Sequence, residues 1–183
     1  MGSGIHLRLI PGGQAPIAQV EPADFDQVFR EYAAYVAAIG LKIMGRDDDL
    51  DDLVQEVFIE AYRGLRRLRE PGALKSWLAR ITVRRTIRKL RRARVLMLFG
   101  LETPSAYGEI ADASASPDER AQVALAYRSL ERLPAAERVV WVLRHIEGES
   151  LDDIAQICAC SKSTVQRRLR LAQKTLEQRT SHV

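Results

Sequence analysis

The chain has 183 residues, room for one domain or two small ones, and a formal net charge of +4 makes it moderately basic. No apolar run approaches the ~20 residues that a membrane-spanning helix needs, and the N-terminus has no signal-peptide core. Two cysteines offer no disulfide framework. These features exclude a membrane protein and a disulfide-rich secreted protein, and we expect a cytoplasmic location.

The first half of the chain reads as a tail and three helices. Residues 1–20 are rich in Gly and Pro without a sustained period, which predicts a flexible tail. From Asp24, the expected N-cap, apolar residues recur at helical steps to about Gly45. A second helix is expected over residues 50–68, ended by Pro71 and Gly72, and a third over residues 74–98.

The exposed side of the expected third helix carries only positive charge. Seven cations lie on it with no acid among them: Arg80, Arg84, Arg85, Arg88, Lys89, Arg91 and Arg92. Like charges one helical turn apart repel, so a helix that is merely solvated usually carries both signs. An unneutralised stripe therefore indicates a polyanionic partner, the alternative being an ordinary solvated surface.

The composition changes after this helix. Residues 100–120 are small, polar and acidic, without a period that could hold a core, so we expect a linker. Helical patterns follow over residues 121–132 and 134–146, and Ser150 then caps a short helix that carries Asp153 three residues later. No β-alternation or internal repeat appears.

The last two predicted helices form a pair with a tight turn at residues 159–161. The second helix has an apolar side and a polar, basic side; the latter carries Lys162, Gln166, Arg167, Arg170 and Lys174. Arg and Gln can make bidentate hydrogen bonds to base edges in the major groove, while Lys, Ser and Thr hold phosphates. The pattern is typical of a DNA-binding helix-turn-helix. A solvated amphipathic helix of a bundle is the alternative.

The same turn contains both cysteines, Cys158 and Cys160. A disulfide in this C-x-C would be badly strained, and a metal site would need further ligands, which the three scattered histidines do not supply. We interpret both as small packing residues. Since no nucleophile, acid–base or Gly-rich phosphate constellation appears either, we expect no catalytic residue, metal, cofactor or small-molecule substrate.

Three segments together resemble a known family. DDLVQEVFIEAYRGL and WLARITVRRTIRKLRR resemble region 2 of the bacterial sigma-70 family, and LERLPAAERVVWVLRHIEGESLDDIAQICACSKSTVQRRL resembles its region 4. The chain is similar to the extracytoplasmic-function (ECF) subfamily of these RNA polymerase sigma factors. The resemblance implies an all-α fold of two small helical domains, a three-helix region 2 over residues 21–99 and a four-helix region 4 over residues 121–183, joined by a flexible linker.

The resemblance also implies a function and its residues: binding of core RNA polymerase, promoter recognition, DNA melting and transcription initiation. The polymerase β′ clamp would bind Asp49, Asp52, Gln55, Glu56 and Arg63. The −10 element, captured as a single strand, would meet Leu68, Trp77, Arg80, Arg84 and Arg88. The double-stranded −35 element would meet Lys162 and two groups of residues: Gln166, Arg167 and Arg170 at base edges, and Ser163, Thr164 and Arg168 at phosphates. Region 4 would also contact the β flap.

The sequence departs from the family pattern at several positions. Arg84 stands where Asn is common and Arg88 where Asp is common, which affects readout of the −10 element. Ala159 replaces the usual turn glycine, so an unchanged turn would force a non-Gly residue into an unfavourable backbone conformation. Leu171 and Gln173 stand where Arg is frequent.

The family resemblance further implies control by an anti-sigma factor, which can hold such a protein at the inner membrane face. The apolar residues 96–99 would be buried by that partner or against the second domain, or they would complete the first core. Two other function classes compete. The first is a helix-turn-helix regulator with an unrelated helical sensor domain, which would not explain the patterns of the second and third helices. The second is an enzyme, for which the sequence shows no catalytic site.

Overall fold

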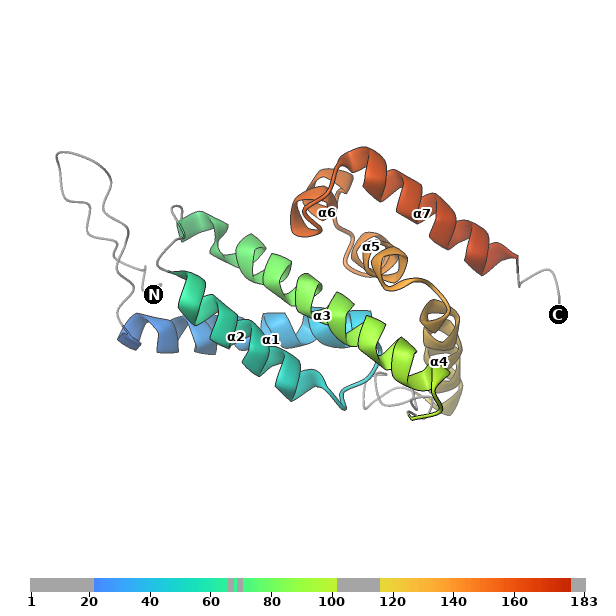
Figure 1. Cartoon of the computed structure of the whole chain (residues 1–183), viewed down its shortest axis with the longest axis horizontal. Coiled ribbons are helices and arrows are strands. Elements are labelled where there is room, and N and C mark those ends of the chain that lie inside the picture. Colours follow the sequence, from blue (N-terminus) through green and yellow to red (C-terminus); the bar gives the residue numbers. More distant parts are fainter. Residues whose placement is uncertain (1–21, 66–67, 69–70, 102–115, 179–183) are drawn as a thin grey trace.

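The computed structural model describes residues 22–65, 68, 71–101 and 116–178. Within these ranges the chain forms seven α-helices and a short 3₁₀ turn, with no strand (Figure 1). This confirms the all-α class. The predicted N-terminal tail, residues 102–115 of the predicted linker and the last five residues lie outside the described ranges. None of the described helices is both long and apolar enough to cross a bilayer.

Helices α1 (Pro22–Met44), α2 (Leu50–Gly64) and α3 (Leu74–Leu98) pack together as a bundle, with the 3₁₀ turn η2 (Pro71–Ala73) leading into α3. Each helix buries one apolar stripe, as its 3.6-residue period requires. Val36 from α1, Leu53 and Val57 from α2, and Leu78 from α3 are fully buried in the middle of this bundle. The three predicted helices of the first half are therefore confirmed.

Two predicted boundaries in this half are wrong. Helix α1 begins at Pro22, so Asp24 lies inside the helix and is not its N-cap. Helix α2 ends at Gly64, four residues before the expected end at Leu68. Glycine has the lowest helix propensity of any residue except proline, so it is a natural place for the helix to stop.

The second half consists of α4 (Pro117–Glu131), α5 (Ala135–His145), α6 (Leu151–Ile157) and α7 (Lys162–Glu177). Three of these helices begin with a serine N-cap. Ser116, Ser150 and Ser161 each accept a hydrogen bond from the backbone N–H three residues ahead. The predicted Ser150 cap is thus confirmed.

Helix α4 starts four residues earlier than the sequence pattern suggested. The expected start was Ala121, with residues 117–120 counted as linker, but Ser116 and Glu119 form a complete capping box. The Ser116 Oγ accepts from the Glu119 N–H at 3.3 Å, and Glu119 Oε2 accepts from the Ser116 N–H at 2.7 Å. Pro117 at the first helical position favours the same start.

The core of the second half takes in residues of the first half, and we call it the shared core. Figure 1 shows α5 and α6 beside α3, and both helices are in contact with it. Ala79 and Val83 of α3 are buried in the same cluster as Val139 of α5 and Ile154 of α6, and Ile43 near the end of α1 joins them. The first bundle also has a core of its own, around Leu53 and Leu78. The predicted domain limits themselves stay a prediction.

We predict that Ile43→Ala lowers the free energy of unfolding by about 2–5 kcal/mol, because its fully buried side chain leaves a cavity in the shared core. Ile59→Ala is the matched control, since that side chain is 45% exposed, and should cost less than about 1 kcal/mol. Urea denaturation followed by circular dichroism measures both. Equal losses would contradict the burial assigned to Ile43.

Candidate nucleic-acid interface

The helix-turn-helix predicted from the sequence is present as α6, a turn and α7. Val165 and Ala172 of α7 are fully buried against the core, as the pattern indicated. Within the turn Ala159 has a φ of +49°, the unfavourable left-handed conformation predicted for a residue in the usual place of glycine. The turn therefore keeps its shape at the cost of local strain.

The polar face of α7 divides into free and engaged side chains. Gln166, Arg167 and Arg170 are exposed and make no hydrogen bond or ion pair with any other described residue. They are available to a ligand, as base-reading side chains must be. Ser163 is exposed, and its hydroxyl lies 2.9 Å from the Ser161 hydroxyl.

Three other residues expected to contact phosphate are already engaged. Lys162 pairs with Asp152 of α6 at 2.8 Å, and the Thr164 hydroxyl lies 2.9 Å from that of Ser161. The half-buried Arg168 points a guanidinium N–H toward Cys160 Sγ at 3.7 Å. Arg168 thus contacts the turn, which the sequence pattern could not reveal.

Both cysteines behave as packing residues. They are free thiols, half-buried, and packed against the shared core. Burial raises the pKa of the Cys158 thiol to about 12, so it stays protonated at neutral pH. No group of three or more potential metal ligands occurs among the described residues.

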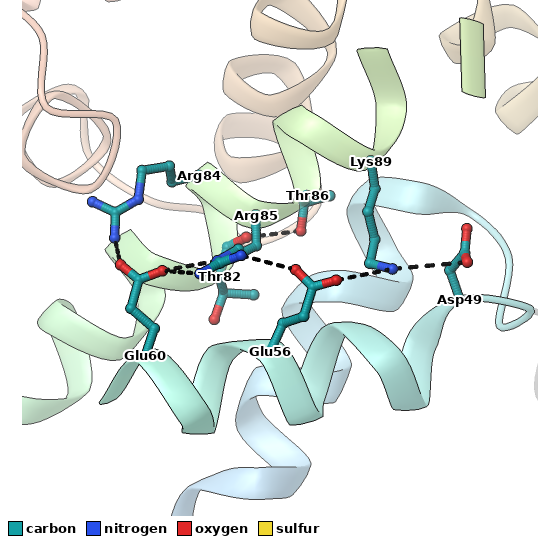
Figure 2. A network of polar contacts seen from close by, with 8 residues as sticks. All are labelled: Asp49, Glu56, Glu60, Thr82, Arg84, Arg85, Thr86 and Lys89. Atoms are coloured by element: carbon teal, nitrogen blue, oxygen red, sulfur yellow. Dashed lines mark hydrogen bonds and ion pairs between the residues drawn. The ribbon is translucent and has the colours of Figure 1, made fainter. Parts of the chain in front are cut away.

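The cationic face of α3 is only partly unneutralised, which corrects the sequence interpretation. Figure 2 shows α2 carboxylates reaching across to three of the seven cations. Glu60 accepts hydrogen bonds from Arg84 and from the Arg85 Nε, the latter at 2.8 Å. Arg85 also donates to Glu56 at 3.1 Å, and Lys89 Nζ lies 3.6 Å from Glu56 and 3.8 Å from Asp49. The acids come from another helix, so α3 alone could not show them.

Four cations of the face remain outside this network. Arg80, Arg88, Arg91 and Arg92 are exposed and form no ion pair with another described residue. Of the residues expected at the −10 element, Arg80 and Arg88 are therefore free, whereas Arg84 is held by Glu60. The free cations still form a stripe that suits a polyanion.

The two apolar residues expected beside this stripe are half-buried. Trp77 lies over Gly64, where a Cβ would come within 2.8 Å of the indole ring. Trp77 and Leu68 both pack against the core of the first bundle. The loop between α2 and α3 is described at Leu65, at Leu68 and from Pro71 onward, while residues 66–67 and 69–70 lie outside the described ranges.

The outer face of α2 combines polar groups with an apolar groove that the sequence did not single out. Asp52, Gln55 and Arg63 are exposed as expected, while Asp49 and Glu56 are half-exposed and belong to the ion-pair network. A groove of about 710 Å³ runs beside them. It is lined by Phe25, Phe29, Asp51, Val54, Gln55, Phe58, Ile59, Tyr62 and Arg63.

A periodic signal for this groove existed in the sequence. Gln55, Ile59 and Tyr62 recur at steps of four and three, and they mark a second face of α2 besides its core stripe. Phe29, which belongs to the apolar pattern of α1, is 42% exposed and lies edge-to-face with Phe58, their ring centroids 4.7 Å apart.

The apolar end of α3 has two different parts. Leu96 and Met97 are half-buried, whereas Leu98 and Phe99 are 79% and 74% exposed. The latter two do not complete the first core within the part of the chain that the structure describes.

Comparison with known proteins identifies both halves. Residues 28–95 match the family described as Sigma-70 region 2, and residues 124–176 match Sigma-70, region 4. The chain is 31% identical over 155 residues to the ECF RNA polymerase sigma factor SigM of Mycobacterium tuberculosis, covering 83% of this chain and 74% of that protein. It is 28% identical over 176 residues to the ECF RNA polymerase sigma-E factor of Haemophilus influenzae, covering 90% and 93%.

Two solved structures share the arrangement of helices. One is the sigma factor RpoE in complex with the anti-sigma factor NepR from Bartonella quintana, with a TM-score of 0.62 and 24% identity over 85% of this chain and 95% of that one. The other is CnrH in complex with the cytosolic domain of CnrY, with a TM-score of 0.57 and 25% identity over 86% and 87%.

We predict that Glu60→Gln lowers the free energy of unfolding by about 1 kcal/mol in dilute buffer, because Arg84 and Arg85 lose their shared carboxylate. The loss should shrink in 1 M NaCl, where charges are screened within about 3 Å. Asp26→Asn is the control, since its pair with Arg30 is over 70% exposed on both sides and should contribute almost nothing. A salt-independent loss in Glu60→Gln would contradict an electrostatic origin.

Proposed function

The chain belongs to the ECF subfamily of sigma-70 RNA polymerase sigma factors, and on that premise we propose that it binds core RNA polymerase and directs it to promoters. It recognises promoter DNA and takes part in strand separation and initiation, while the polymerase carries out the chemistry. One observation carries the proposal: two family regions occur in the family's order, each bearing an exposed surface suited to its partner.

The double-stranded −35 element is assigned to α7. Gln166, Arg167 and Arg170 are free side chains of the types that read base edges, and they project from one helix of a helix-turn-helix. Ser163, Thr164 and Lys162, near the helix N-terminus, are assigned to phosphates. Lys162 would exchange its partner Asp152 for phosphate. Arg168 stabilises the turn through its contact with Cys160 Sγ.

The −10 element is assigned to α3 and the segment before it. Arg80 and Arg88 are the free cations there, and an exposed guanidinium can hold the backbone of a single strand or stack on its bases. Arg84 would have to release Glu60 to join them. Trp77 and Leu68 offer an apolar surface beside the stripe for a base that has left the stack.

Core polymerase is assigned to the outer face of α2. Gln55 and Arg63 line the apolar groove, and the exposed Asp52 lies on the same helix beside the ion-pair network. The surface therefore combines charged groups that steer association with apolar area that gives affinity. Asp49 and Glu56 lie at the edge of this face, where they also hold Lys89. The β′ clamp would bind here, and region 4 would contact the β flap.

Control by an anti-sigma factor is the remaining part of the proposal. The two similar structures contain sigma factors bound to such partners. In this chain the exposed Leu98 and Phe99, close to the exposed Val95, offer an apolar surface that a partner could cover. The protein would act in the cytoplasm, where the polymerase is. It would be held at the membrane only if its anti-sigma factor is itself tethered there.

We predict that Asp52→Arg weakens binding to core RNA polymerase about tenfold or more, because it reverses an exposed charge on the proposed docking face. Asp118→Arg makes the same charge change on exposed α4 and should leave the affinity unchanged. Fluorescence anisotropy with labelled chain measures both. Unaltered affinity in Asp52→Arg, with normal helical content, would refute the docking face.

We also predict that Arg167→Ala and Arg170→Ala each weaken binding to a cognate −35 duplex by about 1–3 kcal/mol and relax its sequence preference. Arg128→Ala removes an equal charge from the exposed surface of α4 and is the control. Titration of duplexes with single base changes separates the roles. A loss that is uniform across all sequences would show phosphate contacts and contradict base readout.

A further inference from the structure

The apolar groove of about 710 Å³ beside α2 is built by two helices. Phe25 and Phe29 of α1 line it on one side, and the Phe58 ring of α2 lies edge-to-face with both, at centroid distances of 6.1 and 4.7 Å. Ile59 and Tyr62 of α2 continue the lining and are 45% and 55% exposed. An exposed apolar hollow of this size indicates a binding surface, because its burial by another segment is favourable.

The two helices run in opposite directions along the groove. The Phe25 ring, near the start of α1, lies 5.1 Å from the Tyr62 ring, near the end of α2. Figure 1 shows the first turns of α1 and the last turns of α2 at the same end of the bundle. The chain that precedes Pro22 therefore joins α1 at the end of the groove lined by Arg63, while Asp51 lines the other end.

The sequence ahead of α1, which lies outside the described residues, contains a segment of matching chemistry. The apolar Ile5, Leu7 and Leu9 occupy every second position. The residues between them, His6 and Arg8, are polar or charged. So short a pattern does not predict a sheet, but alternate side chains of an extended chain point to the same side. Such a segment would place three apolar side chains against the groove and leave the polar ones at its edge.

The segment and the groove have similar lengths. Residues 5–9 would measure about 14 Å when extended, and α2 rises about 17 Å between Asp51 and Tyr62. Twelve residues separate the segment from Pro22, and a chain of that length spans at most about 40 Å. The segment is therefore long enough to cover the groove, and its connection to α1 can reach either end.

Charge favours one direction of the segment in the groove. Asp51 and Arg63, at opposite ends, are exposed and form no ion pair with another described residue. Arg8 is positively charged, so Asp51 attracts it and Arg63 repels it. The favoured arrangement consequently places Arg8 and Leu9 at the Asp51 end and Ile5 at the other end.

We propose that residues 5–9 dock in this groove of the same molecule, with Ile5, Leu7 and Leu9 against its apolar side chains and Arg8 beside Asp51. A short tether gives an effective concentration of about 1 mM, so an intrinsic Kd of about 0.1 mM already favours the docked state about tenfold. The inference goes beyond the proposed function, although the groove lies on the face assigned to core polymerase. Polymerase would have to displace the segment before it used the groove.

Nuclear magnetic resonance on the full-length chain, with isotope-labelled Ile and Leu methyl groups, tests the contact directly. We expect nuclear Overhauser effects from the methyl groups of Leu7 and Leu9 to the rings of Phe29 and Tyr62. Absence of all these effects would overturn the proposal. Effects between molecules in a mixture of labelled and unlabelled chains would also overturn it, because a second copy would then occupy the groove.

Competition with a synthetic peptide of residues 4–10 measures how often the groove is occupied. The variant Leu7→Asp with Leu9→Asp cannot dock its own segment, so it should bind the peptide about tenfold more tightly than the parent chain does. Ala15→Asp with Ala18→Asp makes the same charge change nearer to α1 and should behave like the parent chain. Equal peptide affinity in the Leu7 and Leu9 variant and in the parent chain would overturn the proposal.

A change in the groove itself gives a second test of the same peptide binding. Ile59→Asp, introduced into the Leu7 and Leu9 variant, places a carboxylate among the apolar side chains and should abolish binding of the peptide. Leu125→Asp is the control, since that side chain is 65% exposed on α4, and it should leave the affinity unchanged. Circular dichroism checks the helical content of each variant. Undiminished binding in Ile59→Asp would overturn the groove as the docking site.

A charge exchange tests the assigned direction. Arg8→Glu should lower the docked fraction, read from the chemical shifts of the Leu7 methyl groups, and Asp51→Arg in the same chain should restore it. Failure of the second change to restore docking would overturn the placement of Arg8 beside Asp51. None of these measurements contains polymerase or DNA. Their failure therefore leaves the proposed function standing, whereas a docked segment in a chain that does not bind core polymerase would contradict the proposed function alone.

Discussion

Burial of one face of α3 is the contact on which the rest of the structure depends. Ala79 and Val83 are 1% exposed and lie in the core that α5 and α6 complete, while Leu78 on the neighbouring face belongs to the core with α1 and α2. One helix thereby joins both bundles. The sides of α3 that face neither core carry charged residues. The surfaces assigned to polymerase and DNA result from this separation of apolar and charged sides.

Electrostatics refines that division. Glu56 and Glu60 hold the cations of α3 that face α2, and this leaves Arg80, Arg88, Arg91 and Arg92 turned to solvent without a described acid. The network fixes α3 to α2, although exposed pairs of this kind contribute little free energy each. Its larger effect is on the pattern of surface charge. The cations that face α2 are neutralised by its carboxylates, whereas the exposed cations of α3 form a positively charged stripe.

Local patterns in the sequence were sufficient for most elements. The helical periods predicted the α-class and the helix-turn-helix, and Ser150 with Asp153 three residues later predicted the cap, because each depends on residues within a few positions. The strained turn at Ala159 was implied by the family resemblance, which places a glycine there. The Ser116–Glu119 capping box was equally local and could have been read. Contacts over long separations could not: Glu60 meets Arg85 across 25 residues, and Arg138 meets Met44 across 94. For the same reason the sequence could not show that Phe29 is 42% exposed or that Arg168 contacts Cys160.

The central claim is that this chain gives promoter specificity to a bacterial RNA polymerase. Run-off transcription with core polymerase lacking any sigma subunit, on a library of genomic promoter fragments, tests it most directly. The account predicts discrete transcripts that appear only when the chain is added, together with a stable complex in size-exclusion chromatography. Absence of both transcripts and complex, with a correctly folded chain, would contradict it.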